Sequence, residues 1–163
     1  MAKEKTPEAG MSNGGHHMNM PGPRDVTNWV ETYLRPRYPE LVDEHQAAVK
    51  AYNAAVRTGS LDTRALTTLV DLAQHRSSIL RGQGAEMIGR LSNAFPSARV
   101  AIADLLASRR ANARDSALMA LRFHQLSPLY AELLPEALCD KSHRIRGVAA
   151  EIVLTRGRVE ASP

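Results

Sequence analysis

The chain has 163 residues, a length that suits one domain with a sizeable hydrophobic core. Hydrophobic residues make up 44% of it but aromatic residues only 4%, which favours helices packed through small side chains over a β-sandwich. A single cysteine excludes an internal disulfide framework. The chain has no apolar run of the roughly 18 residues that a membrane span needs and no secretory signal at its N-terminus, so we expect a cytoplasmic protein without membrane contact.

Glycine and proline are frequent in residues 1–23, and the apolar residues there follow no helical or strand period. Too few of them are present to offset the entropy of ordering the segment, so we expect no regular structure and an unchanged melting temperature when it is removed. The run His16-His17-Met18-Asn19-Met20 holds ligands for copper or nickel, but nothing beside it would fix their geometry. We predict adventitious metal affinity, no working metal site and no cofactor.

Residues 24–59 carry two amphipathic segments. Apolar residues recur at helical spacing after Asp25, a candidate N-cap, and Pro36 is expected to end this helix. A second helix is expected to begin at Pro39 and to end at Gly59. One of its faces carries Val42, His45, Val49, Tyr52 and Val56. Repeat arrays need an atypical first unit that covers their exposed apolar face, and this segment is predicted to be that N-terminal helical cap.

A short phrase then recurs, with steps of 33 and 32 residues between its arginines. Its copies are Arg81-x-x-Gly84-Ala85-x-x-Ile88, Arg114-x-x-Ala117-Leu118-x-x-Leu121 and Arg146-x-x-Ala149-Ala150-x-x-Val153. A fixed period on helical patterning is typical of stacked repeats, so the predicted fold class is all-α. The predicted repeats span 60–93, 94–126 and 127–157, before a short tail at 158–163. Their first helices are expected at 62–74, 98–108 and 129–139, and their second helices at 78–92, 112–125 and 143–156.

The last repeat has a proline in its first helix, Pro135, an aspartate in its turn, Asp140, and an arginine that opens its second helix, Arg146. In these features it resembles the HEAT-repeat family. The period is shorter than the usual 40 or so residues of that family and is similar to that of phycobilin-lyase-type HEAT-like repeats. The resemblance covers residues 62–156 and implies a right-handed α-solenoid of about three helical pairs. It also implies that the side chains of Asp140 and Arg146 tie the turn together.

Alignment of the repeats places basic residues in two columns at the bends between paired helices. The first column contains Arg76, Arg109 and Lys141, with Arg110 and Arg144 beside it, and the second contains Arg81, Arg114 and Arg146. Equivalent positions in a stack form ladders about 10 Å apart, and these ladders predict a basic ridge that suits phosphates or an acidic protein surface. We expect Arg146 to serve its own turn. Arg81 and Arg114 lack the local aspartate, so we include them in the ridge and leave their role open.

The array stops without a visible cap. Its last second helix is apolar on almost every side, whereas a terminal repeat normally turns a polar face to water. We expect an uncovered apolar face centred on Val148 and Ile152, with Leu154 beside them, to contact a second copy of the chain or another partner. The alternative is that the last residues, with Val159, fold back as a lid.

No catalytic constellation emerges, because the chain has no Gly-rich phosphate loop, H-E-x-x-H motif or nucleophile elbow. We therefore expect a non-enzymatic helical-repeat scaffold that binds a protein partner through the basic ridge and the apolar C-terminal face. The first alternative is a nucleic-acid-binding module that uses the arginine ladders. A more distant alternative is an enzyme on the same fold, similar to HEAT-like DNA glycosylases or lyases, although the repeats hold few aromatic residues for base stacking.

Overall fold

The computed structural model describes residues 29–124 and 127–160, and most of them are helical. None of these residues belongs to a β-strand, so the all-α prediction is confirmed for this part of the chain. Side chains are described for residues 29–124 and 131–155. The predicted tail at 1–23, with its histidine and methionine run, lies outside the described residues.

The N-terminal helical segment consists of η1 (Val30–Leu34), α2 (Arg35–Arg37), η2 (Pro39–Leu41) and α3 (Val42–Thr58). The expected N-cap Asp25 lies outside the described residues. The prediction that the first helix ends at Pro36 is confirmed to within one residue, because the continuous helical segment of η1 and α2 ends at Arg37. The chain turns at Tyr38, whose φ of −144° is not helical. Gly59 ends α3 with a φ of 64°, a left-handed conformation that glycine adopts without strain.

Six further helices follow where helical pairs were predicted. They are α4 (Thr63–Ala73), α5 (Ser78–Leu91), α6 (Pro96–Leu106), α7 (Ala111–Leu121), α8 (Ser127–Leu138) and α9 (His143–Glu160). Two ends differ from the prediction by more than two residues. α7 ends at Leu121 and not at residue 125, because the chain tightens there into a turn in which the N–H of His124 donates to the carbonyl of Leu121 (3.2 Å). α9 continues to Glu160, beyond residue 156 and into the segment predicted as a tail.

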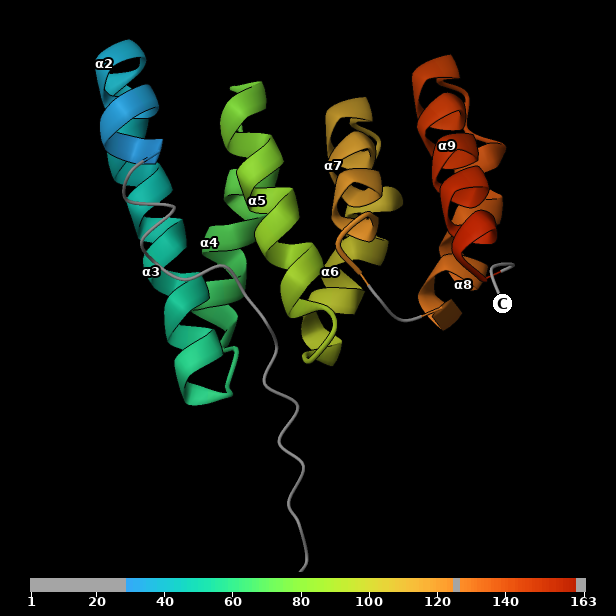
Figure 1. Ribbon diagram of the computed structural model, residues 1–163, viewed down its shortest axis with the longest axis horizontal. Coiled ribbons are helices and arrows are strands. Elements are labelled where there is room, and N and C mark those ends of the chain that lie inside the picture. The colour runs from blue at the N-terminus through green and yellow to red at the C-terminus, as the bar shows by residue number, and fades with distance from the viewer. Residues whose placement is uncertain (1–28, 125–126, 161–163) are drawn as a thin grey trace, which may run out of the picture.

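The helices stand side by side in two rows (Figure 1). One row holds α3, α5, α7 and α9, and the other holds α4, α6 and α8. Helices contact their neighbours within a row as well as their partners in the other row. The core lies between the rows, where Leu69 and Ile102 from one row and Ile88 and Leu121 from the other are fully buried. Burial of each such side chain contributes roughly 1.5–3 kcal/mol.

Small residues bring the helix backbones together at two places. A methyl group added at Gly84 would collide with the backbone of Ala73 in α4, and one added at Gly89 would collide with the carbonyl group of Ala120 in α7. The hydroxyl of Ser116 in α7 also donates to the carbonyl oxygen of Ala73 at 2.6 Å, in a buried position. Glycine in the middle of a helix is therefore required here for close packing.

Candidate functional site

The loops between the helices of each pair meet at one edge of the molecule, and each is closed in the same way. In every loop the Nη1 group of the arginine from the second basic column donates to two backbone carbonyl oxygens of the loop. These oxygens have no partner within a helix. The donor–acceptor sets are Arg81 with His75 (3.0 Å) and Arg76 (2.8 Å), Arg114 with Ser108 (2.9 Å) and Arg109 (3.1 Å), and Arg146 with Asp140 (2.7 Å) and Lys141 (3.1 Å). The second basic column therefore shapes the loops.

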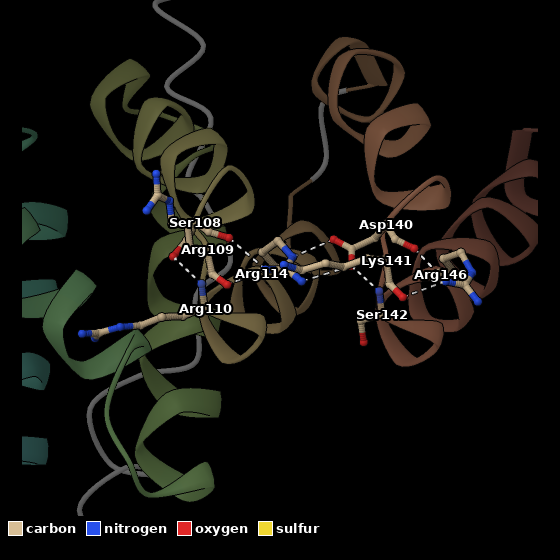
Figure 2. A network of polar contacts seen from close by, with 8 residues as sticks. All are labelled: Ser108, Arg109, Arg110, Arg114, Asp140, Lys141, Ser142 and Arg146. Atoms are coloured by element: carbon tan, nitrogen blue, oxygen red, sulfur yellow. Dashed lines mark hydrogen bonds and ion pairs between the residues drawn. The ribbon is translucent and has the colours of Figure 1, made fainter.

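The Asp140 carboxylate joins two neighbouring pairs (Figure 2). It accepts from Nε of Arg114 at 2.6 Å, from Nη2 of Arg114 at 3.1 Å and from the N–H of Ser142 at 2.7 Å. The Arg114 guanidinium, aided by the Ser142 N–H, holds the pKa of Asp140 below its usual value. The expected tie between the side chains of Asp140 and Arg146 is wrong, because Arg146 binds the carbonyl oxygen of Asp140 and the carboxylate turns to the preceding repeat.

The prediction that Arg81 and Arg114 belong to an exposed basic ridge is also wrong. The Arg114 side chain is 7% exposed and its charge is matched by Asp140. Arg81 is half-buried with its guanidinium on loop carbonyls. Both side chains use their donors to satisfy backbone groups that would otherwise be unpaired, and this leaves little capacity for a ligand.

The first basic column is exposed. Arg76, Arg109, Arg110 and Lys141, which we call the basic edge, are all exposed, and their side chains make no hydrogen bond or ion pair with the described residues. Figure 2 shows the guanidinium groups of Arg109 and Arg110 extending away from the loop network. The loops beneath them are held by the arginines of the second column. The loops that carry these cations are therefore held in one conformation, and the hydrogen-bond donors of the cations remain available to a ligand.

Arg144 differs from the basic edge, with which it was grouped. Its side chain is 75% exposed, but Nε and Nη2 donate to the Asp115 carboxylate at 3.2 and 2.9 Å. A second pair, Arg122 with Glu151 at 2.7 Å, joins the same two helices. Both pairs tie α9 to α7, and so Arg144 is already partly neutralised.

The predicted apolar C-terminal face needs a similar correction. Ile152 is only 3% exposed and Val148 is half-buried, because this side of α9 faces α7 and α8. The exposed apolar residues are Val153 (42%) and Leu154 (66%), on the other side of the helix. An apolar surface is therefore present at this end of the described chain, but it is rotated away from the predicted centre.

Two buried polar contacts had no signal in the sequence. Ser92 and His124 are fully buried, and the Ser92 hydroxyl lies 2.6 Å from Nδ1 of His124 and 2.7 Å from the carbonyl oxygen of Gly89. The Ser92 hydroxyl thus forms hydrogen bonds with both the Gly89 carbonyl and the His124 ring. Asn93 adds a bond to the carbonyl oxygen of Phe123 at 3.0 Å. None of these residues belongs to a repeated phrase, and their contacts join loops that only the folded chain brings together.

Two grooves also emerge only in the structure. One, of about 720 Å³, follows the outer side of α3 and includes Val49, Val56 and Lys50 in its wall. The other, of about 570 Å³, runs between α4 and α6, with Val70 and Val100 among its lining residues. Both have largely apolar walls, and a sequence pattern of single helices gives no signal for a space between two of them.

The described residues contain no group of three or more His, Cys, Asp or Glu side chains that could hold a metal ion. Among them there is also no helix with the length and apolar character needed to cross a membrane. Comparison with family models, with curated proteins and with solved structures finds no match for this chain.

Proposed function

We propose that this chain is a non-enzymatic helical-repeat protein, a right-handed HEAT-like α-solenoid, that binds a partner protein through its basic edge. The observation that carries the proposal is the contrast between the two basic columns. Arg114 serves the scaffold, whereas Arg109 and Arg110, a few residues away, offer their guanidinium groups to solvent. Equivalent loops repeat the arrangement with Arg76 and Lys141.

The fixed loop geometry favours recognition of anions. A guanidinium group binds a carboxylate with two parallel hydrogen bonds, so an edge of such groups suits a surface rich in Asp and Glu. The loops cannot relax easily, because each carbonyl that the arginine column satisfies is held at 2.7–3.1 Å. Binding to a pre-organised edge loses less conformational entropy than binding to a mobile one. The exposed apolar surface of α9 is a second interface, separate from the basic edge.

The experiment is a pull-down from native lysate with the immobilised full chain, with and without nuclease. Wild type is compared with Arg109→Glu/Arg110→Glu. The matched control is Arg57→Glu/Arg64→Glu, which makes the same charge change at two exposed residues, one in the last turn of α3 and one in the first turn of α4. We expect a nuclease-resistant protein that the control retains and the basic-edge variant loses. Retention by both variants would contradict the proposal.

A nucleic-acid ligand is the alternative outcome. Phosphate contacts release condensed counterions, so such binding would vanish with nuclease and fall steeply as salt is raised. A protein interface with an apolar centre depends less on salt. Repeating the capture at several salt concentrations therefore separates the two ligand classes.

A further inference from the structure

The side of α9 that faces away from the rest of the protein carries a regular stripe. His143, Gly147, Ala150 and Leu154 follow one another at helical spacing, with Val153 on the flank. Leu154 is 66% exposed, Gly147 is exposed and Ala150 is half-buried. The opposite side of the helix, with Ile145, Ala149 and Ile152 as its centre, is buried against the other helices.

The same positions are covered in the preceding helices of the row. Ala85 in α5 and Leu118 in α7 are the repeat equivalents of Ala150, and both are fully buried. Ile88 and Leu121, the equivalents of Val153, are fully buried too. In α5 and α7 this face contacts the next helix of the row, whereas no described helix follows α9. Among the described helices, α9 thus leaves this contact face open.

The row also shows how such a face is closed. α5 and α7 approach until a methyl group at Gly89 would strike the backbone of Ala120. In α9 the repeat equivalent of Gly89 is Leu154, and the small residue of the exposed stripe is Gly147, where an added methyl group would meet nothing within 4 Å. Gly147 therefore forms a hollow, and Leu154, two turns further along the same stripe, forms the projection that could fill one.

We infer that a second copy of this chain covers the face, by antiparallel packing of the two α9 helices about a two-fold axis beside Ala150. The stripe is self-complementary. Gly147 and Leu154 lie on opposite sides of this axis at nearly equal distances, so Leu154 of each copy fills the hollow at Gly147 of the other. A surface that contains both a projection and its hollow, placed in this way, fits itself, as an isologous interface requires.

The small side chain of Ala150 at the axis lets the helices come close, as Gly89 does between α5 and α7. The arrangement also separates like charges, since the two Arg146 side chains fall toward opposite ends of the interface. Burial of Leu154 and Val153 supplies the apolar gain. A second copy is thus the partner of the apolar α9 surface named in the proposed function, and this contact does not depend on the basic edge.

Sedimentation equilibrium of the full chain tests the inference first. We expect a mass twice the 17.8 kDa of the monomer, reduced to one half of the wild-type mass by Leu154→Glu. Val100→Glu, at a valine that is 60% exposed on α6, is the control and should remain a dimer. A monomeric wild type across the micromolar range would overturn the inference, and so would a dimer that Leu154→Glu leaves intact.

Disulfide formation tests the geometry. Replacement of the one cysteine, Cys139→Ser, gives a background in which Gly147→Cys and Leu154→Cys are introduced separately. A mixture of the two variants should form the intermolecular disulfide. Each variant alone should not, because the two identical thiols in its homodimer lie about 10 Å apart along the helix axis, beyond disulfide reach. Equal cross-linking in all three samples would overturn the antiparallel register.

Two other occupants would give different results. If residues 161–163, which follow α9, cover the face, the wild type is a monomer and removal of those residues allows it to dimerise. If another protein covers it, the wild type is a monomer with or without them. Either result overturns the second copy. The same two experiments distinguish the second copy from the partner of the basic edge. Arg109→Glu/Arg110→Glu should sediment as a dimer like the wild type, and Leu154→Glu should still capture the nuclease-resistant protein.

Discussion

Arg114 and Asp140 form a two-pronged ion pair between neighbouring helical pairs, with Nε 2.6 Å from Oδ2 and Nη2 3.1 Å from Oδ1. Their side chains are only 7% and 11% exposed. The same guanidinium donates to the carbonyl oxygens of Ser108 and Arg109 in its own loop. One side chain therefore fixes the conformation of a loop and the contact between that loop and the next.

Arg114→Ala is expected to lower the free energy of unfolding by about 3 kcal/mol, because it leaves the Asp140 carboxylate nearly buried without its cation. Urea unfolding followed by circular dichroism measures the change. Arg109→Ala is the control, since its exposed side chain makes no contact with the described residues, and it should change stability by less than about 0.5 kcal/mol. Equal effects of the two substitutions would show that the ion pair contributes nothing.

Gly89→Ala is expected to destabilise the protein by about 1–3 kcal/mol, because the added methyl group collides with the backbone of α7. Gly82→Ala lies in the same helix with open space around the new methyl group, and it should stabilise by about 0.5–1 kcal/mol through the higher helix propensity of alanine. Thermal unfolding of both variants gives the comparison. A destabilised Gly82→Ala, or a stabilised Gly89→Ala, would contradict the close packing of α5 on α7.

Ser92→Ala is expected to lower the free energy of unfolding by about 1–3 kcal/mol, because the carbonyl of Gly89 loses its buried hydrogen-bond donor and Nδ1 of His124 loses its hydrogen-bond partner. Ser97→Ala replaces an exposed serine in α6 and should be nearly neutral. Chemical unfolding at neutral pH distinguishes the two. If the serines behave alike, the buried contact does not stabilise the fold.

Stability should fall with acidification because of His45. Its side chain is fully buried, with the Trp29 ring centroid 5.1 Å away, and burial lowers its pKa below the usual 6.5, a shift that Gln83 only partly opposes. At a pH between the lowered pKa of native His45 and 6.5, the unfolded chain binds a proton at this residue and the native chain does not. The neutral, buried His45 therefore contributes its full stability above pH 6.5, and this stability is lost as the pH falls from 6.5 through the lowered pKa.

Unfolding free energies of wild type and His45→Gln at about pH 8 and about pH 5 measure this contribution. The wild type should lose more stability between the two conditions than the variant, because the histidines that both proteins share cancel in the comparison. An identical loss in the two proteins would place the acid sensitivity elsewhere.

Local patterns predicted most of the helices, since apolar spacing and the prolines and glycines between segments are properties of neighbouring residues. Pro36, for example, lies one residue before the end of the first helix. The end of α7 was missed, because the turn at His124 is held by contacts across the loop.

The site was less accessible to sequence reasoning. The repeat period placed Arg76, Arg109 and Lys141 at equivalent bends, but it could not separate them from Arg81 and Arg114. That distinction depends on where each guanidinium finds its acceptors, and for Arg114 the partner carboxylate lies 26 residues away. Ile152 was misplaced for a similar reason, because an apolar helix with several apolar sides does not reveal which of them its neighbours cover.

The reach of Arg114 into the following pair limits how the protein can be shortened. A fragment that stops after α7 would keep this nearly buried guanidinium and lose the carboxylate that neutralises it. Removing the last two helices therefore does more than expose an apolar surface, because it also removes the carboxylate that neutralises Arg114. A minimal stable fragment has to include the loop that carries Asp140.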